Sequence, residues 1–483
     1  MSTSTLTTIA RSGSAELSAN HRRLVLAICC MSLLIVGMDT TIVNVALPSI
    51  RGDLHASVSG LQWTIDAYTV VLASLLILSG STADRLGRRR TFQAGLVLFT
   101  LGSLLCSVAP GLGWLVAFRM LQAVGGSMLN PVAMSIITNV FTDPRERARA
   151  IGVFAGTVGI SLGVGPVIGG VLIDSIGWRS IFWINVPIGI AAFVLAALFI
   201  PESRAERARR VDPLGQILVI VMLLSLTYAI IDAPRAGDSP EIWALAALSV
   251  LALAALVLYE SRRRDPLIEL AFFRSIPFSG ATLTAVCAFG AFSGFLFLNT
   301  LYLQDVRGFS ALQTGLFLLP AAAMVAIFAP ISGRMVAGRG PRTPLLIAGG
   351  AMCIAALPLT RLSDHLGYGW LLACFLVFGL GFGMVNAPIT NAAVSGMPRS
   401  QAGVAAAIAS TSRQVGASLG VAVVGAIVSN GAGAGIRAEF AHASHAGWWI
   451  VAGCAAAVFV LALATTGRRA AASAATVAGL LDD

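Results

Sequence analysis

Residues 24–46 of the chain read LVLAICCMSLLIVGMDTTIVNVA, and this stretch decides the class of fold. It has the length, roughly 20 apolar residues, that a helix needs to cross a bilayer. Asp39 interrupts it, and a charge at that depth costs roughly 2.5–3.5 kcal/mol on insertion scales. The stretch therefore predicts a membrane-spanning helix that carries a carboxylate for a functional reason.

The rest of the chain has the composition of a membrane protein. Of its 483 residues, 57% are hydrophobic and 11% are charged, whereas a soluble domain carries about 25% charged residues. The net charge is +10, and every basic residue is an arginine. The arginines lie between apolar runs and not on one polar face with aromatic residues, so we do not expect a nucleic-acid partner.

Further apolar runs of spanning length follow the first. Irregular backbone cannot face lipid, so helices are the expected structure of such runs. The sequence therefore predicts an all-α integral membrane protein with fourteen transmembrane helices, at 24–46, 61–81, 91–109, 113–136, 149–173, 180–200, 214–232, 241–259, 279–302, 314–337, 343–362, 370–394, 404–430 and 446–466.

The placement of the arginines orients these helices, because cytoplasmic loops carry an excess of Arg and Lys. With the N-terminus inside, Arg119 and Arg413 fall within helices and most other arginines fall on the inner side. The outer loops then hold only Arg51, Arg179, Arg235, Arg307, Arg361 and Arg437. This asymmetry predicts a multi-pass protein of the bacterial cell (inner) membrane with both termini in the cytoplasm.

The chain also repeats itself. Residues 125–163 and 381–420 each contain a glycine, an asparagine, a proline and then Ser-Leu-Gly, in that order, and Gly80–Arg90 has a weaker echo at 333–342. Repeated halves with a site between them are the usual plan of secondary transporters. We expect a cytoplasmic tail at 1–23, a six-helix bundle at 24–200, an inserted helix pair with its linkers at 201–278, a second six-helix bundle at 279–466, and an alanine-rich cytoplasmic tail at 467–483.

Four stretches resemble those of a known family. They are Met38–Ile50, Gly80–Arg90, Arg119–Gly126 and Gly159–Gly170. In this order and in these helices they resemble motifs of the major facilitator superfamily, in particular its fourteen-helix drug:proton antiporters of the multidrug exporter type. The resemblance covers about residues 24–466. The fourth stretch is similar to the fifth-helix motif of exporters.

The resemblance implies two six-helix bundles related by pseudo-twofold symmetry, with two extra central helices. It also implies export by alternating access of lipophilic, often cationic small molecules, with protons as the second transported species. The proton gradient would be the energy source, and no cofactor is expected. The protein would act as a monomer in the lipid bilayer and would not be an enzyme.

The predicted proton-coupling residues are Asp39, Asp66 and Arg119. By position in their spans, all three lie roughly 8–10 Å below the outer boundary, at about 1.5 Å per residue, so they could meet. Burial disfavours the charged form of an aspartate and a nearby arginine favours it, which suits a carboxylate that gains and loses a proton. In the family, the counterpart of Arg119 is implicated in this coupling. The alternative is a static charge cluster that fixes helix packing.

Two further motifs have predicted mechanical roles. Glycines permit the tight inner turn at Gly80–Arg90, and the resemblance implies a charge-relay latch there; the alternative is membrane anchoring alone. Small residues in the fifth helix permit close packing and a bend, so that the halves can rock. The gating-loop residues are Gly80, Asp84, Arg85, Gly87, Arg88 and Arg89, and the antiporter-helix residues are Gly159, Gly163, Gly165, Pro166, Gly169 and Gly170.

A mostly apolar substrate cavity with a few polar groups is expected between the halves. Phe292, Phe295 and Asn299 share one helix face by their spacing, although core packing is the more common role of any single aromatic residue. The candidate lining residues are Asn44, Gln62, Trp63, Tyr68, Phe289, Phe292, Phe295, Asn299 and Asn386.

Other kinds of site are not predicted. No glycine-rich loop ends in Gly-Lys-Ser/Thr, so ATP would not drive the protein directly. The cysteines and histidines show no metal-ligand spacing. Besides a multidrug exporter, the sequence leaves open a dedicated exporter of one metabolite, such as a self-made antibiotic, an amino acid or a siderophore, and a lipid translocase. The buried carboxylates argue against a membrane scaffold that transports nothing.

Overall fold

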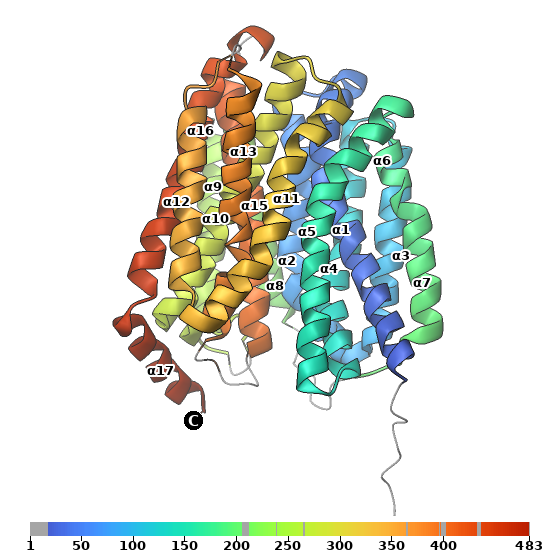
Figure 1. The fold of residues 1–483 in the computed structure, drawn as a ribbon, viewed down its shortest axis with the longest axis vertical. Coiled ribbons are helices and arrows are strands. Elements are labelled where there is room, and N and C mark those ends of the chain that lie inside the picture. Colours follow the sequence, from blue (N-terminus) through green and yellow to red (C-terminus); the bar gives the residue numbers. More distant parts are fainter. Residues whose placement is uncertain are drawn as a thin grey trace, which may run out of the picture.

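A computed structural model describes residues 18–204, 212–237, 239–263, 266–363, 366–395, 397, 402–431 and 436–482. The tail up to residue 17 and the side chain of Arg437 therefore lie outside the described part. Every regular element within these ranges is a helix (Figure 1). The N-terminal bundle contains α1 (Ala19–Leu54), α2 (Val58–Leu86), α3 (Arg88–Ser107), α4 (Leu112–Val140), α5 (Pro144–Ser175), α6 (Ser180–Trp183) and α7 (Asn185–Phe199).

The inserted pair is α8 (Pro213–Ala236) and α9 (Pro240–Glu260). The C-terminal bundle follows, and its helices are η1 (Leu270–Arg274), α10 (Ile276–Leu301), η2 (Tyr302–Val306), α11 (Ala311–Arg339), α12 (Arg342–Leu359), α13 (Tyr368–Gly383), α14 (Asn386–Val394), α15 (Ala402–Gly431), α16 (Ile436–Thr465) and α17 (Arg468–Asp482). The alanine-rich tail thus forms a helix, α17, whose Ser473 Oγ accepts a hydrogen bond of 3.0 Å from the first backbone N–H of α10.

Thirteen helical segments in the described residues are long and apolar enough to cross a bilayer. The third predicted span, which forms α3, is not among the thirteen because Arg88, Arg89 and Arg90 open the helix and lower its mean hydropathy. It is nevertheless 20 residues long and stands among the others, packed on α4 and α7 (Figure 1). The predicted all-α membrane fold is therefore confirmed, with helices that extend a few residues beyond several of the apolar runs.

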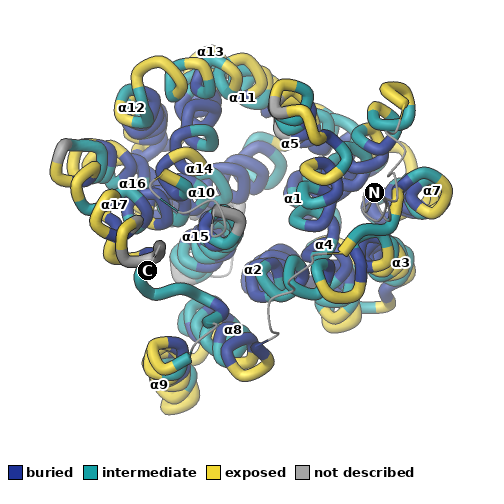
Figure 2. Tube along the Cα trace, turned by 90° about the horizontal axis from the view of Figure 1, so that it is seen from below, coloured by how far each residue is buried: buried dark blue, intermediate teal, exposed yellow. Residues whose placement is uncertain are grey.

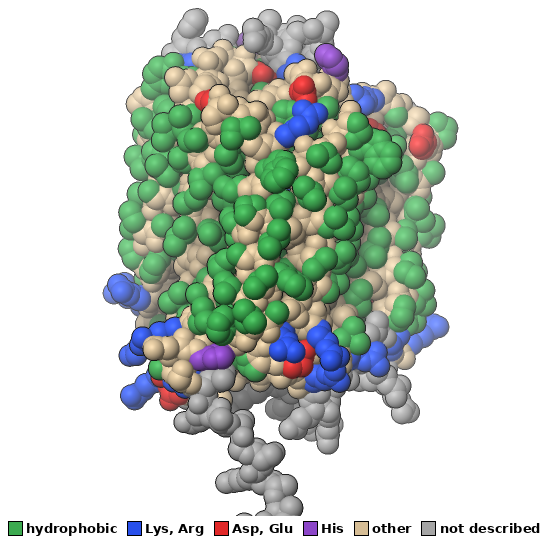
Figure 3. Space-filling model, turned by 90° about the vertical axis from the view of Figure 1, so that its right-hand side faces the viewer, with side chains coloured by type: hydrophobic (Ala, Val, Ile, Leu, Met, Phe, Trp, Pro, Cys, Tyr) green, Lys and Arg blue, Asp and Glu red, His purple; other side chains and the backbone are tan. Residues whose placement is uncertain are grey.

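The outer surface suits a bilayer. In Figure 3 apolar side chains cover the middle of the molecule, and arginines gather mainly at the lower end. The start of α1 and the end of α17 lie at that same end in Figure 1. Large apolar side chains such as Trp114, Leu198 and Val250 are more than half exposed. A soluble protein could not maintain such a surface, whereas lipid favours it.

The helices form an inner and an outer set. Seen along the helices in Figure 2, α1, α2, α10 and α15 lie toward the middle, and α3, α7, α12 and α16 lie at the outside. The pair α8 and α9 stands apart at one edge. Of these two, α8 packs on both α2 and α15, and Val219 and Leu223 of α8 share an apolar cluster with Val70 and Ala73 of α2.

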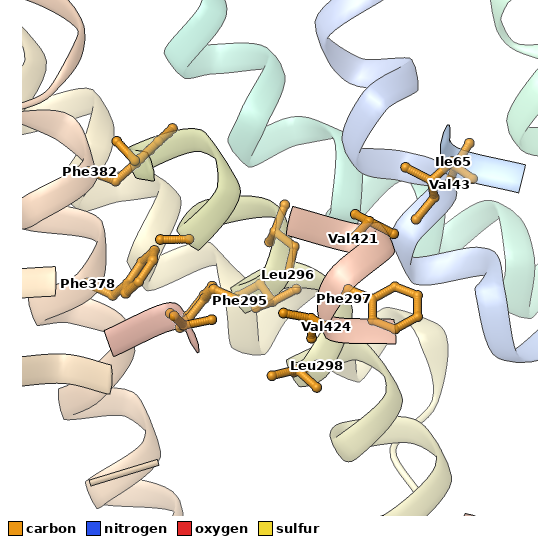
Figure 4. Close-up of a cluster of buried hydrophobic side chains, with 14 of the residues drawn as sticks. Val43, Ile65, Phe295, Leu296, Phe297, Leu298, Phe378, Phe382, Val421 and Val424 are labelled. Atoms are coloured by element: carbon orange, nitrogen blue, oxygen red, sulfur yellow. The ribbon is translucent and has the colours of Figure 1, made fainter. Parts of the chain in front are cut away.

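The apolar core is continuous between the bundles. Figure 4 shows it running from Phe378 and Phe382 of α13, through α10 and α15, to Val43 and Ile65 of the N-terminal bundle. Aromatic stacking organises the C-terminal side, where the rings of Phe295 and Phe378 are 4.0 Å apart and nearly parallel. Such contact favours a close-packed arrangement of the inner helices.

Candidate functional site

A buried ion pair occupies the interior of the N-terminal bundle. Asp39 of α1 accepts a hydrogen bond of 2.5 Å from Arg119 Nη1 of α4, through its Oδ2 atom. The two side chains are 0% and 1% exposed. Two charges are stable at such depth only when they are paired and further hydrogen-bonded. The structure thus brings together two of the three residues predicted for proton coupling.

Neutral side chains complete the partners of Asp39. Gln122 lies one turn after Arg119 in α4; its Oε1 accepts from Arg119 Nη1 at 2.7 Å, and its Nε2 donates to Asp39 Oδ1 at 2.8 Å. Asn185, the first residue of α7, donates to the same Oδ1 atom at 3.2 Å. Both amides also reach Ser103 Oγ of α3. Side chains from α1, α3, α4 and α7 therefore form one hydrogen-bonded network, in which Asp39 accepts from α4 and α7.

The α2 helix supplies the remaining contacts of Arg119. Arg119 Nε donates to the backbone carbonyl oxygen of Thr64 at 3.2 Å. Its guanidinium lies 4.2 Å from the ring centroid of the fully buried Tyr68. Tyr68, a predicted cavity residue, thus lies inside the N-terminal bundle beside the ion pair. We call Asp39, Ser103, Arg119, Gln122 and Asn185, with Tyr68, the polar cluster.

Asp66 lies outside the polar cluster. It is fully buried, its Oδ1 accepts from Thr69 Oγ1 of its own helix at 3.3 Å, and Ser418 of α15 lies beside it. One turn earlier, Gln62 Nε2 donates to the backbone oxygen of Ala422 of α15 at 2.8 Å. This face of α2 therefore places polar side chains at the boundary between the two bundles.

The predicted aromatic cavity residues pack within the protein. The ring of Trp63 lies 5.6 Å from that of Tyr228 in the inserted pair. Phe289 and Phe292 both contact Phe382 of α13. Phe295 is 1% exposed and stacks on Phe378, as described above. The structure thus places Phe292 and Phe295 against α13, inside the C-terminal bundle.

The predicted polar cavity residues have varied surroundings. Asn44 and Asn299 are buried and donate to backbone oxygens one turn earlier in their own helices. In the described part of the chain, the amide oxygens of both, and that of Gln62, have no hydrogen-bond partner. Asn386 is the first residue of α14 and is half-buried. A buried acceptor without a partner is costly, so these oxygens are points where a donor would bind favourably.

The loop between α2 and α3 is organised by Glu202, a residue that sequence reasoning missed. Glu202 Oε1 accepts from the backbone N–H of Arg89 at 3.1 Å, and its other oxygen lies 3.7 Å from Arg90 Nε. Gly87 has φ +111° and contacts this carboxylate so closely that a side chain would collide with it.

The remaining predicted loop residues lie close by. Asp84 accepts from Arg88 Nη2 within the loop at 3.1 Å. Arg85 is exposed in the last turn of α2, and nothing lies close to Gly80 on the side where a Cβ would project. The loop thus fastens α2 and α3 to the end of α7, within one bundle.

The predicted antiporter-helix residues form two faces of α5. Gly165 and Gly169 meet Thr41 and Ile42 of α1, in the same bundle. The other face meets α11 of the C-terminal bundle. On that face a Cβ on Gly163 would lie 3.2 Å from that of Ala322. The residues that face α11 are Gly159, Gly163, Pro166 and Gly170.

Polar contacts join the bundles at the end opposite the arginine-rich end. Asp174, at the end of α5, caps the first turn of α11: its carboxylate accepts from Ser310 Oγ at 2.7 Å and from the backbone N–H groups of Ala311 and Leu312 at 3.2 and 3.0 Å. Arg51 of α1 pairs with Asp305 of η2 at 3.1 Å. In this structure the bundles are therefore fastened together at this end.

Comparisons with known proteins agree with this architecture. A multidrug resistance protein, Stp, from Mycobacterium tuberculosis is 36% identical over 400 residues, covering 83% of this chain and 74% of that protein. The tetracenomycin C resistance and export protein of Streptomyces glaucescens is 37% identical over 406 residues, covering 83% and 75%. The puromycin resistance protein of Streptomyces alboniger is 36% identical over 421 residues, covering 86% and 83%.

A solved structure shares the fold. It is a bacterial homologue of the human lysosomal transporter Spinster, in an inward-facing and unoccupied conformation. It aligns with a TM-score of 0.60 and 18% identity over 96% of this chain and 98% of that one. The family model of the Major Facilitator Superfamily matches residues 29–421. In sequence the chain resembles the resistance and export proteins named above, and it therefore belongs to the Major Facilitator Superfamily.

Proposed function

We propose that this protein exports lipophilic, often cationic small molecules from a bacterial cell in exchange for protons. The observation that carries the proposal is the Asp39–Arg119 pair, a carboxylate sealed in a membrane-spanning bundle and held by an arginine. An ionisable residue inside a membrane is costly and is usually functional. The relatives named for drug resistance support export as the direction of transport.

In the proposed cycle, a proton binds Asp39 and neutralises it. The carboxyl group then holds Arg119 only weakly, and Arg119 keeps the Thr64 carbonyl and the Tyr68 ring. Because the partners of Asp39 come from α4 and α7, protonation frees these helices to repack against α1. Proton binding and bundle movement are coupled in this way, and release of the proton to the cytoplasm restores the ion pair.

Alternating access would follow from the two most extensive contacts between the bundles. The bundles meet where α5 packs on α11 and where α2 packs on α15. By the excess of arginines at the opposite end, the fastened end faces outward and both termini lie in the cytoplasm. The described state is then closed toward the outside, and breaking the Asp174 and Arg51 contacts would open it.

A dedicated exporter of one antibiotic is the second candidate. Two of the relatives carry the names of single compounds, tetracenomycin C and puromycin. A susceptibility panel on cells that express the protein separates the two. Raised resistance to several unrelated compounds supports the multidrug exporter, and raised resistance to one compound supports the dedicated exporter.

The coupling is tested with purified protein in proteoliposomes that contain ethidium and no ATP. We expect an imposed proton gradient to drive ethidium transport in the wild type and not in Asp39→Asn. Transport that persists at full rate after a protonophore removes the gradient would contradict proton exchange. Equal proton-driven rates in the wild type and Asp39→Asn would contradict the assigned role of Asp39.

A further inference from the structure

A further charged side chain lies deep in the membrane-spanning region, in the C-terminal bundle. Arg413 belongs to the candidate span Val404–Ser429 of α15. At about 1.5 Å per residue it lies roughly 13 Å from the start of that span. An arginine at this depth is rare and costly, so its partners indicate its role.

The partners of Arg413 are neutral. Its Nη2 donates to Thr390 Oγ1 of α14 at 2.6 Å, and its Nη1 donates to Ser410 Oγ at 3.0 Å. In the described part of the chain its Nε atom has no acceptor, and no ion pair includes it. Arg119, by contrast, has a carboxylate, an amide and a backbone carbonyl as acceptors. Arg413 is thus a cation without the counter-charge that Arg119 has.

The surroundings of Arg413 also differ from the polar cluster in how far they are exposed. Arg119 is 1% exposed, whereas Arg413 is half-buried, and Thr390 and Asn391 beside it are exposed. Helix α14 packs on α10, α11 and α15, and Figure 2 shows it inside the C-terminal bundle, with α12 and α16 farther out. Thr390 is therefore an exposed residue on a helix that lies inside the C-terminal bundle.

We propose that Arg413, Thr390 and Ser410 form a subsite for an acidic group, a carboxylate or a phenolate, on a lipophilic substrate. The guanidinium presents paired N–H donors to such an anion, and the low-dielectric surroundings strengthen the interaction. Thr390 and Ser410 accept from Arg413 through their oxygens, so each hydroxyl keeps its hydrogen to donate. The assignment of the ligand as a transported substrate rests on the proposed export function, and it extends that function to acidic compounds.

Binding to the purified full chain tests the subsite. The probes are 1-pyrenebutyrate, a lipophilic carboxylate, and its methyl ester, which has the same shape without the charge. We expect the wild type to bind the acid at least tenfold more tightly than the ester, as followed by pyrene fluorescence. Arg413→Gln should abolish this preference. The matched control is Arg361→Gln, which removes an exposed arginine at the other end of the bundle. This variant should keep the preference for the acid.

Equal affinity of the wild type for acid and ester would overturn the proposal, and so would a preference that survives in folded Arg413→Gln. If Arg413→Gln does not fold, Thr390→Val decides: it removes one hydroxyl donor and should reduce the preference several-fold, and an unchanged preference would overturn the proposal. Ethidium transport is measured separately. A wild type that transports ethidium but shows no preference for the acid contradicts only the subsite, whereas a wild type that prefers the acid but does not transport ethidium contradicts only the export function.

Discussion

The chemistry of the polar cluster is concentrated on one carboxylate. Asp39 receives donors from Arg119, Gln122 and Asn185, so a change at any of them alters the others. Removing one partner of a fully buried ion pair costs about 3–5 kcal/mol, because the other charge loses its compensation. The individual residues therefore act as one unit, and their substitutions should not be additive.

We expect Asp39→Asn and Arg119→Lys each to reduce proton-driven transport at least tenfold. Asparagine keeps the size of Asp39 and removes its charge. Lysine keeps the charge of Arg119 but lacks the planar guanidinium group with its several N–H donors. The double variant should be no slower than the slower single variant. Transport rates in proteoliposomes measure the effect of each variant. The amount of protein recovered from the membrane checks that each variant folds.

The matched control is the Asp53–Arg179 pair in the same bundle, which is as short, at 2.6 Å, but about half exposed. An exposed pair contributes about 0–1 kcal/mol, so Asp53→Asn and Arg179→Lys should transport like the wild type. Additive losses at Asp39 and Arg119 would show that they act in separate steps.

The sequence predicts the charged residues of the cluster and not the neutral ones. A charge inside an apolar run is conspicuous, so Asp39 and Arg119 stand out. Ser103 and Asn185 cost little in an apolar run, and nothing in the sequence indicates that they turn toward α1. Asp66 is as conspicuous as Asp39, but its direction depends on the rotation of α2, which places it toward α15. Glu202 was missed because it lies in a linker where charges are common.

At the scale of helices, α5 illustrates how a sequence motif becomes an interface. Its glycines allow the α5 backbone to approach α11 on one face and α1 on another. The sequence predicts close contact there, since small residues permit it. It does not predict which glycines face the other bundle, because that depends on how each bundle is assembled.

We expect Gly170→Ala to slow transport because a Cβ there would overlap backbone atoms of Ala311 and Leu312. Overpacking of this kind costs about 1–3 kcal/mol and would hold the bundles apart at the fastened end. The control is Gly156→Ala in the same helix, where nothing lies within 4 Å. It should leave transport unchanged, and it should raise the unfolding temperature slightly because alanine favours a helix. Equal transport by the two variants would contradict a role for close contact at Gly170.

At the scale of the whole molecule, one side chain from the N-terminal bundle caps a helix of the C-terminal bundle. A side-chain cap contributes about 1 kcal/mol, and 1.4 kcal/mol is tenfold in an equilibrium. Asp174→Ala should therefore increase by about fivefold the population in which the bundles are separated at the fastened end. Spin labels at the exposed residues Ile176 and Trp370, in a protein whose native cysteines are replaced, report that distance.

Asp143 is the matched control, because it caps α5 within its own bundle. Asp143→Ala removes a cap of the same kind and should leave the distance distribution unchanged. A shift of similar size in both variants would mean that general loss of stability, and not loss of the contact between the bundles, separates them at the fastened end.

The approximate positions of the spanning helices were predictable because each span must be apolar along its length. The direction in which the aromatic side chains pack was not predictable. Phe292 and Phe295 are predicted cavity residues, and in this structure their rings stack on Phe382 and Phe378 of α13. In a membrane helix every face is apolar, so the sequence carries little information on which face meets lipid, a neighbouring helix or a cavity.

The inserted pair makes the molecule asymmetric in the plane of the bilayer. Helix α8 covers the boundary between α2 and α15, whereas along α5 and α11 large side chains such as Ile160, Leu316 and Ile327 remain exposed at the surface. A lipophilic compound dissolved among the acyl chains can therefore reach the junction of the bundles from one side only. If the protein takes its substrate from the inner leaflet, the substrate can enter from the membrane only between α5 and α11.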